Sequence, residues 1–202
     1  MKNVWPNRSL VNGLAFVALC VASVSVSRAD TPIVSALLGN WVGPGLDKVR
    51  APSGAEAYLR RSVRFTPDLE TLRIEAFADE KGTIRLFTYE SDGPYKVIGP
   101  SSDIVGAYEI DLTNDRSLMT IHIADPGLWK GLNLGACPLA VGKAVEISAC
   151  ASGPPFNTSS CIDRDLVQID AAGALRFGDQ ASNRCEKRPT TLDRAHYIKA
   201  QN

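Results

Sequence analysis

The side chains with the most distinctive chemistry in this chain of 202 residues are four cysteines in its last third, Cys137, Cys150, Cys161 and Cys185. No Cys-x-x-Cys pair occurs and no histidine lies near these cysteines, so their spacing does not suit a zinc site. The fifth cysteine, Cys20, lies in the first 29 residues, which are expected to be removed; the four thiols that remain favour two disulfides in an oxidising compartment, with three pairings open. One pairing, Cys150 with Cys161, would close the Ser-, Gly- and Pro-rich stretch 151–160 into a loop. We predict two disulfides, no metal site and no cofactor.

Residues of the other catalytic types form no known motif. The sequence contains no Gly-x-Ser-x-Gly, His-Glu-x-x-His, phosphate-binding Gly-rich loop or nicotinamide fingerprint. Its two histidines, His122 and His196, stand apart, and His122 falls on the polar face of an expected strand. Four carboxylates fall at expected turns, where such groups accept hydrogen bonds from the local backbone: Asp68, Glu70, Asp79 and Glu80. We predict no catalytic residue. The alternative is an enzyme, for which the candidate catalytic residues are Arg61, His122 and Tyr108.

Arg61 is unusual because it falls on an apolar strand face. It shares that face with three apolar residues, Leu59, Val63 and Phe65. A guanidinium there needs a polar partner. It would either hold a ligand carboxylate or phosphate inside an apolar cavity, or serve a structural role by forming a salt bridge with Glu75 or Glu109 or by reaching the mouth of the barrel. Both interpretations stay open at this point.

Strands must position these residues, because alternation with a period of two recurs along the chain. Residues 57–65 and 71–78 alternate apolar and polar side chains, and the pattern resumes at 84–89 after a turn at 79–82. Turn clusters, among them 91–94, separate further short runs of this kind. These runs are 95–98, 105–112, 118–123, 144–148, 166–169 and 174–177. This regular spacing predicts an all-β fold, an antiparallel barrel or half-barrel.

One segment, 126–142, departs from the alternating pattern. Its glycines and prolines argue against a long helix, so we predict a short helix or a lid loop over one end of the barrel. Trp129 lies in this segment, where it would cap a ligand or occupy an exposed or interfacial position.

The first 29 residues are typical of an export signal. A basic start is followed by the run 14–26, apolar except for serines, and by small residues at 27 and 29, where cleavage would leave Asp30 first. A run of thirteen residues is too short to span a bilayer as a helix. The whole chain has 22 basic and 22 acidic residues. Removing residues 1–29 takes away three basic and no acidic residues, so 19 basic and 22 acidic residues remain and the net charge is −3. We predict a secreted or periplasmic single domain, 30–202, without a membrane span or affinity for nucleic acid.

Several short motifs occur in an order that resembles one known family. A Gly-x-Trp ends at Trp41, Ala51-Pro52 follows, a Leu-x-Arg strand ends at Phe65, and Arg188-Pro189 comes late. This order resembles the domain of the adenomatosis polyposis coli down-regulated (APCDD) family, although no cysteine precedes the first link. The resemblance implies a lipocalin-like barrel or half-barrel, with Trp41 across its closed end and a hydrophobic cavity. In the animal members of the family the partner is a lipidated signalling protein.

The strands and the resemblance together predict a binding protein for a hydrophobic small molecule or lipid. The residues expected to contact this ligand are Leu59, Arg61, Val63, Phe65, Leu72, Ile74, Ile84, Leu86, Tyr108, Ile110, Ile121 and Trp129. Arg61 would orient an anionic headgroup near the mouth of the barrel. A register error of one residue would replace Tyr108 and Ile110 by Ala107 and Glu109. The alternatives are a cavity enzyme, an isomerase or hydrolase, and an envelope-interaction protein whose barrel is filled by side chains.

Overall fold

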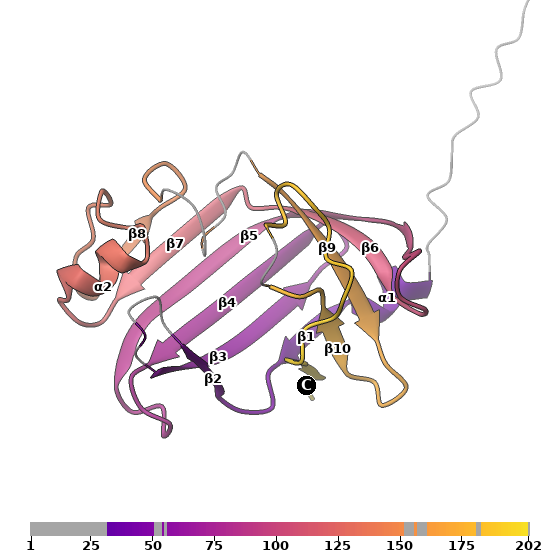
Figure 1. Ribbon diagram of the computed structural model, residues 1–202, viewed down its shortest axis with the longest axis horizontal. Coiled ribbons are helices and arrows are strands. Elements are labelled where there is room, and N and C mark those ends of the chain that lie inside the picture. Colours follow the sequence, from indigo (N-terminus) through magenta and orange to yellow (C-terminus); the bar gives the residue numbers. More distant parts are fainter. Residues whose placement is uncertain are drawn as a thin grey trace, which may run out of the picture.

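The computed structural model describes residues 32–50, 54, 56–151, 156, 161–180 and 183–201. The fold is nearly all β, an almost closed antiparallel barrel with two short helices (Figure 1), as the sequence predicts. The elements are α1 (Pro32–Leu37), β1 (Gly39–Val42), β2 (Asp47–Arg50), β3 (Glu56–Phe65), β4 (Leu69–Phe77), β5 (Arg85–Pro100), β6 (Tyr108–Thr113), β7 (Arg116–Ile121), α2 (Pro126–Gly131), β8 (Ala144–Glu146), β9 (Ile162–Ile169), β10 (Leu175–Phe177) and β11 (Ile198–Lys199). The expected signal at 1–29 and the expected start at Asp30 lie outside the described residues.

The strands follow one another around the barrel in the order β10-β9-β6-β5-β4-β3-β1-β11. The two ends of this order meet at Leu175 of β10 and Tyr197, the residue before β11. The Leu175 amide donates to the Tyr197 carbonyl at 2.9 Å, and the Tyr197 amide donates to the Leu175 carbonyl at 2.8 Å. In the described part of the chain this residue pair bridges the two ends of the strand order, so the barrel is nearly closed.

Strands β3 and β4 carry the alternation that was expected of them. Leu59 lies opposite Ala76, Arg61 opposite Ile74, and Val63 opposite Leu72. Directly opposed residues of an antiparallel pair point to the same side of the sheet. Hence Arg61 shares the inward face with these apolar side chains.

Strand β5 turns the corner of the barrel. Its first part pairs with β7 and its last part pairs with β6, so one strand of 16 residues serves two neighbours. The turn expected at 91–94 is wrong, because β5 runs through this stretch. A Cβ atom on Gly93 would lie 1.6 Å from the carbonyl oxygen of Thr113, so glycine lets the segment between β6 and β7 pass close to β5.

Strands β7 and β8 with α2 form one wing of the molecule, and β9 with β10 forms the other (Figure 1).

The core has two clusters, one for each wing. The cluster beside β9 and β10 contains Trp41, Phe65 and Ile110, and the cluster beside β7 and α2 contains Met119 and Trp129. Trp41 is 2 % exposed, its indole NH donates to the Leu37 carbonyl at 2.7 Å, and the Lys199 ammonium lies 5.2 Å from its ring centroid. The tryptophan therefore joins α1, β1 and β11 within the first cluster.

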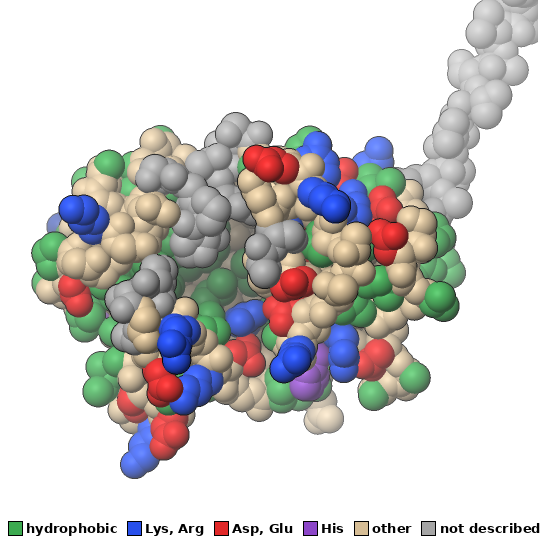
Figure 2. Space-filling view, viewed as in Figure 1, with side chains coloured by type: hydrophobic (Ala, Val, Ile, Leu, Met, Phe, Trp, Pro, Cys, Tyr) green, Lys and Arg blue, Asp and Glu red, His purple; other side chains and the backbone are tan. Residues whose placement is uncertain are grey.

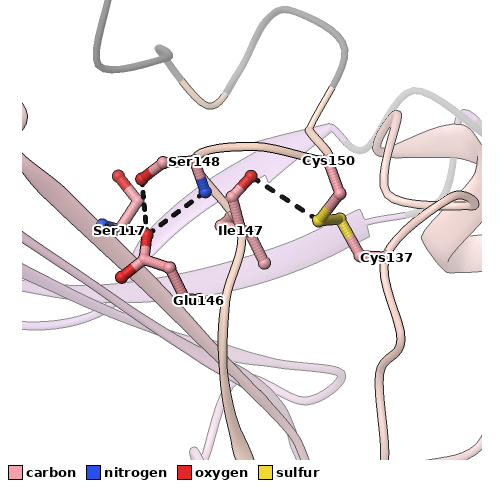
Figure 3. Close-up of a disulfide and its surroundings, with 6 residues drawn as sticks. All are labelled: Ser117, Cys137, Glu146, Ile147, Ser148 and Cys150. Atoms are coloured by element: carbon pink, nitrogen blue, oxygen red, sulfur yellow. Dashed lines mark hydrogen bonds between the residues drawn. A yellow bond between two sulfur atoms is a disulfide. The ribbon is translucent and has the colours of Figure 1, made fainter.

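Two disulfides tie irregular segments to the barrel, as the cysteine count predicts. Cys137 pairs with Cys150, which links the segment after α2 to the segment after β8 (Figure 3). Cys161 pairs with Cys185, which links the start of β9 to the C-terminal segment. The pairing of Cys150 with Cys161, considered from the sequence, is not the one that forms. Both disulfides suit an oxidising compartment.

No membrane-spanning helix is found in the described part of the chain. Helices α1 and α2 have six residues each, whereas a helical span needs about 20.

Candidate functional site

A cavity of about 260 Å³ lies between the inward face of β3 to β5 and the wing of β9 and β10. The molecule is visibly hollowed in the middle of this face (Figure 2). Much of the wall is apolar and includes Leu59, Leu72, Ile74, Phe87, Tyr89 and Phe177. The period of two places these side chains together, since alternate residues of neighbouring strands share one face.

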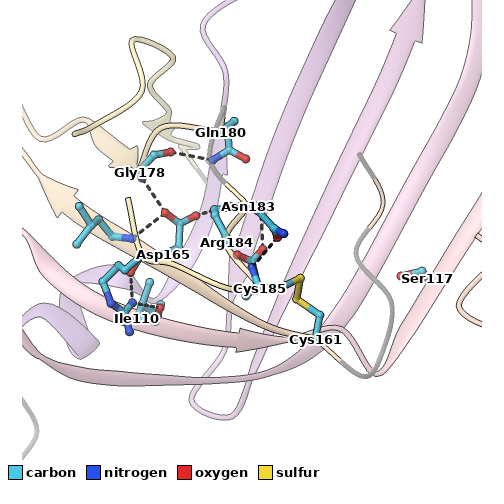
Figure 4. Close-up of polar contacts among 12 residues, drawn as sticks. Ile110, Ser117, Cys161, Asp165, Gly178, Gln180, Asn183, Arg184 and Cys185 are labelled. Carbon is cyan, nitrogen blue, oxygen red and sulfur yellow. Dashed lines mark hydrogen bonds and ion pairs between the residues drawn. A yellow bond between two sulfur atoms is a disulfide. The ribbon is translucent and has the colours of Figure 1, made fainter. Parts of the chain in front are cut away.

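A charged cluster forms the polar part of the wall. Asp163 and Asp165 lie on the inward face of β9, opposite inward residues of β6, and Arg184 reaches both. Its Nη2 lies 2.9 Å from Asp163 Oδ2, and its Nη1 donates to Asp165 Oδ2 (Figure 4). Asp165 Oδ1 accepts from the amides of Leu166 at 2.7 Å and Gly178 at 2.9 Å. Gly178 must lack a side chain, because a Cβ atom there would lie 2.5 Å from Asp165 Oδ1.

Arg61 lines the cavity, and its ion-pair partner is neither of the residues considered from the sequence. Its Nε lies 3.3 Å from Asp47 Oδ2 on β2. Glu75 instead pairs with arginines of the outer face of the sheet, and Glu109 pairs with Arg188 at 3.3 Å. The expected salt bridges to Glu75 and Glu109 are therefore wrong, because β3 presents Arg61 to the opposite side of the sheet from Glu75.

Glu70 is the site residue that the sequence reasoning placed wrongly. It was expected at a turn, but it lies on β4 opposite Phe65 and Gly93, lines the cavity and is 6 % exposed. The structure shows no hydrogen bond or ion pair of its carboxyl group with any described residue. Burial raises the pKa of Glu70 to about 8, and the nearby Asp163 carboxylate adds to this shift. The signal was present in the sequence, because Glu70 continues the alternation of Leu72 and Ile74.

Asp165 shares this environment but has partners. Burial raises its pKa to about 6, against the opposing effect of the Arg184 guanidinium. At neutral pH the cavity thus holds a carboxylate at Asp165 and a neutral carboxyl group at Glu70.

Glu70→Gln is expected to remove a loss of stability at high pH. The pKa of Glu70 is about 8 in the folded protein against an ordinary value of 4.5, so its neutral form stabilises the fold below about pH 4.5. That contribution is lost as the pH rises through 8. Between pH 5 and pH 8 the free energy of unfolding of the wild type should fall by on the order of 3 kcal/mol more than that of the variant. Urea unfolding at the two pH values measures this difference.

The matched control is Glu90→Gln, on the neighbouring strand. Glu90 is half-exposed and pairs with Arg73 at 2.5 Å on the outer face. This variant should keep the pH dependence of the wild type. Equal slopes for the wild type and Glu70→Gln would show that Glu70 titrates as a solvated carboxyl group.

The residues predicted to contact a ligand are divided among several places. The cavity is lined by four of them: Leu59, Arg61, Leu72 and Ile74. Val63, Phe65 and Ile110 belong to the core cluster around Trp41, and Tyr108 packs against it half-buried. The register of β6 therefore places Tyr108 and Ile110 inward, and Glu109 faces the other side of the sheet. Ala107, just before the strand, is also buried.

On β5 the predicted face is wrong. Ile84 precedes the strand and is 55 % exposed, and Leu86 packs half-buried against the second core cluster. The cavity is lined instead by Phe87 and Tyr89, because Tyr89 pairs with inward-facing Ile74. A bulge between Ala76 and Phe77 shifts the register at the end of this ladder, which reasoning on each strand alone does not reveal.

Ile121 and Trp129 line a second cavity of about 270 Å³ beside α2. The short helix expected in this segment is confirmed: Asp125 caps it by accepting from the Leu128 amide at 3.0 Å. Trp129 is 6 % exposed and lies edge-on to Phe87 with 6.2 Å between centroids. It packs α2 onto the sheet.

The residues considered for an enzyme do not form one site. His122 Nε2 lies 3.1 Å from the Thr88 hydroxyl, and Thr88 points away from the cavity-lining Phe87 and Tyr89. Burial and nearby Arg85 lower the pKa of His122. Among the described residues, no group of His, Cys, Asp or Glu side chains is arranged to hold a metal ion.

Comparison of the sequence with protein-family models and with curated proteins finds no match.

Proposed function

We propose that this protein is an exported binding protein that holds a small hydrophobic ligand in its barrel cavity. The observation that carries the proposal is the cavity itself, which has about 260 Å³ of space between an apolar sheet face and a charged cluster. Ligand sites are typically concave and mostly apolar, with a few polar groups that fix orientation.

The size of the cavity limits the ligand. Its volume equals that of about nine water molecules at roughly 30 Å³ each. It is therefore somewhat smaller than most ligand pockets, which span roughly 300 to 1,000 Å³. A short apolar chain or a single ring fits this space better than a whole lipid.

The proposed location rests on the residue pattern of 1–29 and on the cysteines. Residues 1–29 have the order of an export signal, and two disulfides persist best outside the cytosol. Membership of the APCDD family is part of the same proposal and rests on the short motifs around Trp41, Phe65 and Arg188.

Ile74→Trp is expected to weaken ligand binding at least tenfold. Ile74 lines the cavity, and a bulkier indole at this position would occupy space that the ligand needs. Calorimetric titration with hexan-1-ol should give a dissociation constant between about 1 µM and 1 mM for the wild type, or about −8 to −4 kcal/mol.

Ile84→Trp is the matched control, since both isoleucines were expected to line the cavity. Ile84 is 55 % exposed, so this variant should bind as the wild type does. If the wild type binds neither hexan-1-ol nor its charged analogues, the barrel is a filled structural scaffold and the proposed function is wrong.

A further inference from the structure

The charges around the cavity are unequally matched. Arg184 is held by Asp163 and Asp165, whereas Arg61 forms an ion pair with Asp47 in which its Nε makes no hydrogen bond. Burial raises the pKa of Tyr197 beside Arg61, and the guanidinium opposes that shift. Both guanidinium groups of the wall are thus already engaged by carboxylates, and Glu70 is a further acidic group beside them.

Besides Arg61 Nε, which is buried without a hydrogen bond 3.3 Å from Asp47 Oδ2, two polar groups of the cavity wall make no regular hydrogen bond with a described residue. One is the Glu70 carboxyl group, on a side chain that is 6 % exposed. The other is the Ser91 hydroxyl, on a residue that is 1 % exposed. Ser91 lies near enough to the Tyr89 hydroxyl to lower the pKa of that tyrosine, but its Oγ makes no hydrogen bond of regular geometry.

These two groups lie on the same wall of the cavity. Ser91 pairs with Leu72 and Gly93 pairs with Glu70, so Glu70 and Ser91 are diagonal neighbours on the inward face of β4 and β5. Diagonal neighbours of an antiparallel pair have Cα atoms roughly 7 to 8 Å apart. One small group placed between them can contact both.

We propose that the ligand is a small apolar amine, whose ammonium group pairs with the Glu70 carboxylate and donates to the Ser91 hydroxyl. This inference rests on the proposed function and specifies its ligand. The apolar body lies against Leu72, Ile74 and Phe87. An anionic headgroup is disfavoured, since it would face three acidic residues while Arg61 and Arg184 are already paired.

Binding of the amine carries a proton balance. In the free protein Glu70 is neutral at pH 7, since burial and the nearby Asp163 carboxylate raise its pKa to about 8. The charges that act most strongly on Glu70 are those of Asp163 and Asp165 of β9, Arg184, and Asp92 of β5, and Glu70 also interacts electrostatically with Tyr89 and Tyr197. An ammonium ion that displaces the carboxyl proton forms the ion pair and releases one proton to solvent. Affinity therefore rises with pH until Glu70 is ionised in the free protein.

The test is calorimetry on the full secreted chain with hexylamine, hexan-1-ol and hexanoate, in two buffers that differ in ionisation enthalpy. Hexylamine should bind at least tenfold more tightly than hexan-1-ol at pH 8, and hexanoate should bind most weakly. The wild type should release close to one proton per hexylamine at pH 6.5, and its affinity should rise about tenfold between pH 6.5 and pH 8.

Glu70→Gln should bring hexylamine to the affinity of hexan-1-ol and abolish the proton release, while Glu90→Gln should change neither. Hexan-1-ol binding with no preference for hexylamine, or a preference that survives Glu70→Gln, would overturn the amine inference and leave the proposed function standing. Binding of none of the three compounds would overturn both.

Discussion

Trp41→Ala is expected to lower the free energy of unfolding by about 3 to 5 kcal/mol, the usual cost of removing a large aromatic side chain from a core. Trp41 is 2 % exposed and lies opposite Val63 of β3 and Lys199 of β11. Its loss would leave a void where α1 meets the strands that complete the ring. Urea unfolding followed by circular dichroism measures the change.

Trp41→Phe is the control for this result. It keeps most of the ring but removes the hydrogen bond from the indole NH to the Leu37 carbonyl, so it should cost about 1 to 2 kcal/mol. A loss below about 1 kcal/mol for Trp41→Ala would mean that the tryptophan does not hold this end of the barrel together.

Gly93→Ala should be at least as damaging, with a loss of about 4 kcal/mol or more. The added methyl group would lie 1.6 Å from the Thr113 carbonyl oxygen and 2.7 Å from the Thr113 carbonyl carbon, both of them backbone atoms. Backbone cannot rotate away as a side chain does, so the ladder of β5 must break toward β6 or β7. Thermal unfolding and the yield of folded protein would report this.

Gly99→Ala, on the same strand, provides the comparison. No atom lies within 4 Å of the position its Cβ would take, so its stability should stay within about 1 kcal/mol of the wild type. Similar stabilities for the two variants would show that β5 and Thr113 do not approach as closely as the fold requires.

Gly93 also affects the cavity. Gly93 pairs with Glu70, and Ser91 lies two residues before it. If the Thr113 backbone can no longer approach Gly93, β5 must shift, and the Glu70 carboxyl group and the Ser91 hydroxyl would no longer lie on the same wall of the cavity. Gly93→Ala is therefore expected to abolish ligand binding in any fraction that folds.

The sequence by itself determined what depends on local geometry. Successive side chains of a strand alternate between two faces, so the pattern at 57–65 was sufficient to place Arg61 inward with Leu59 and Val63. The same rule would have placed Glu70 inward with Leu72, had it been read as part of β4 and not as a turn. The number of cysteines was likewise enough to predict two disulfides.

Only the tertiary structure decided which distant groups meet. Cys161 pairs with Cys185, Arg61 finds Asp47 on β2, and Arg184 reaches the inward face of β9. Each of these contacts depends on how non-adjacent segments are brought together, which no spacing along the chain encodes. The inward face of β5 was misassigned for the same reason: register between strands is set by pairing and bulges across the sheet, whereas the alternation within one strand is set by its own backbone.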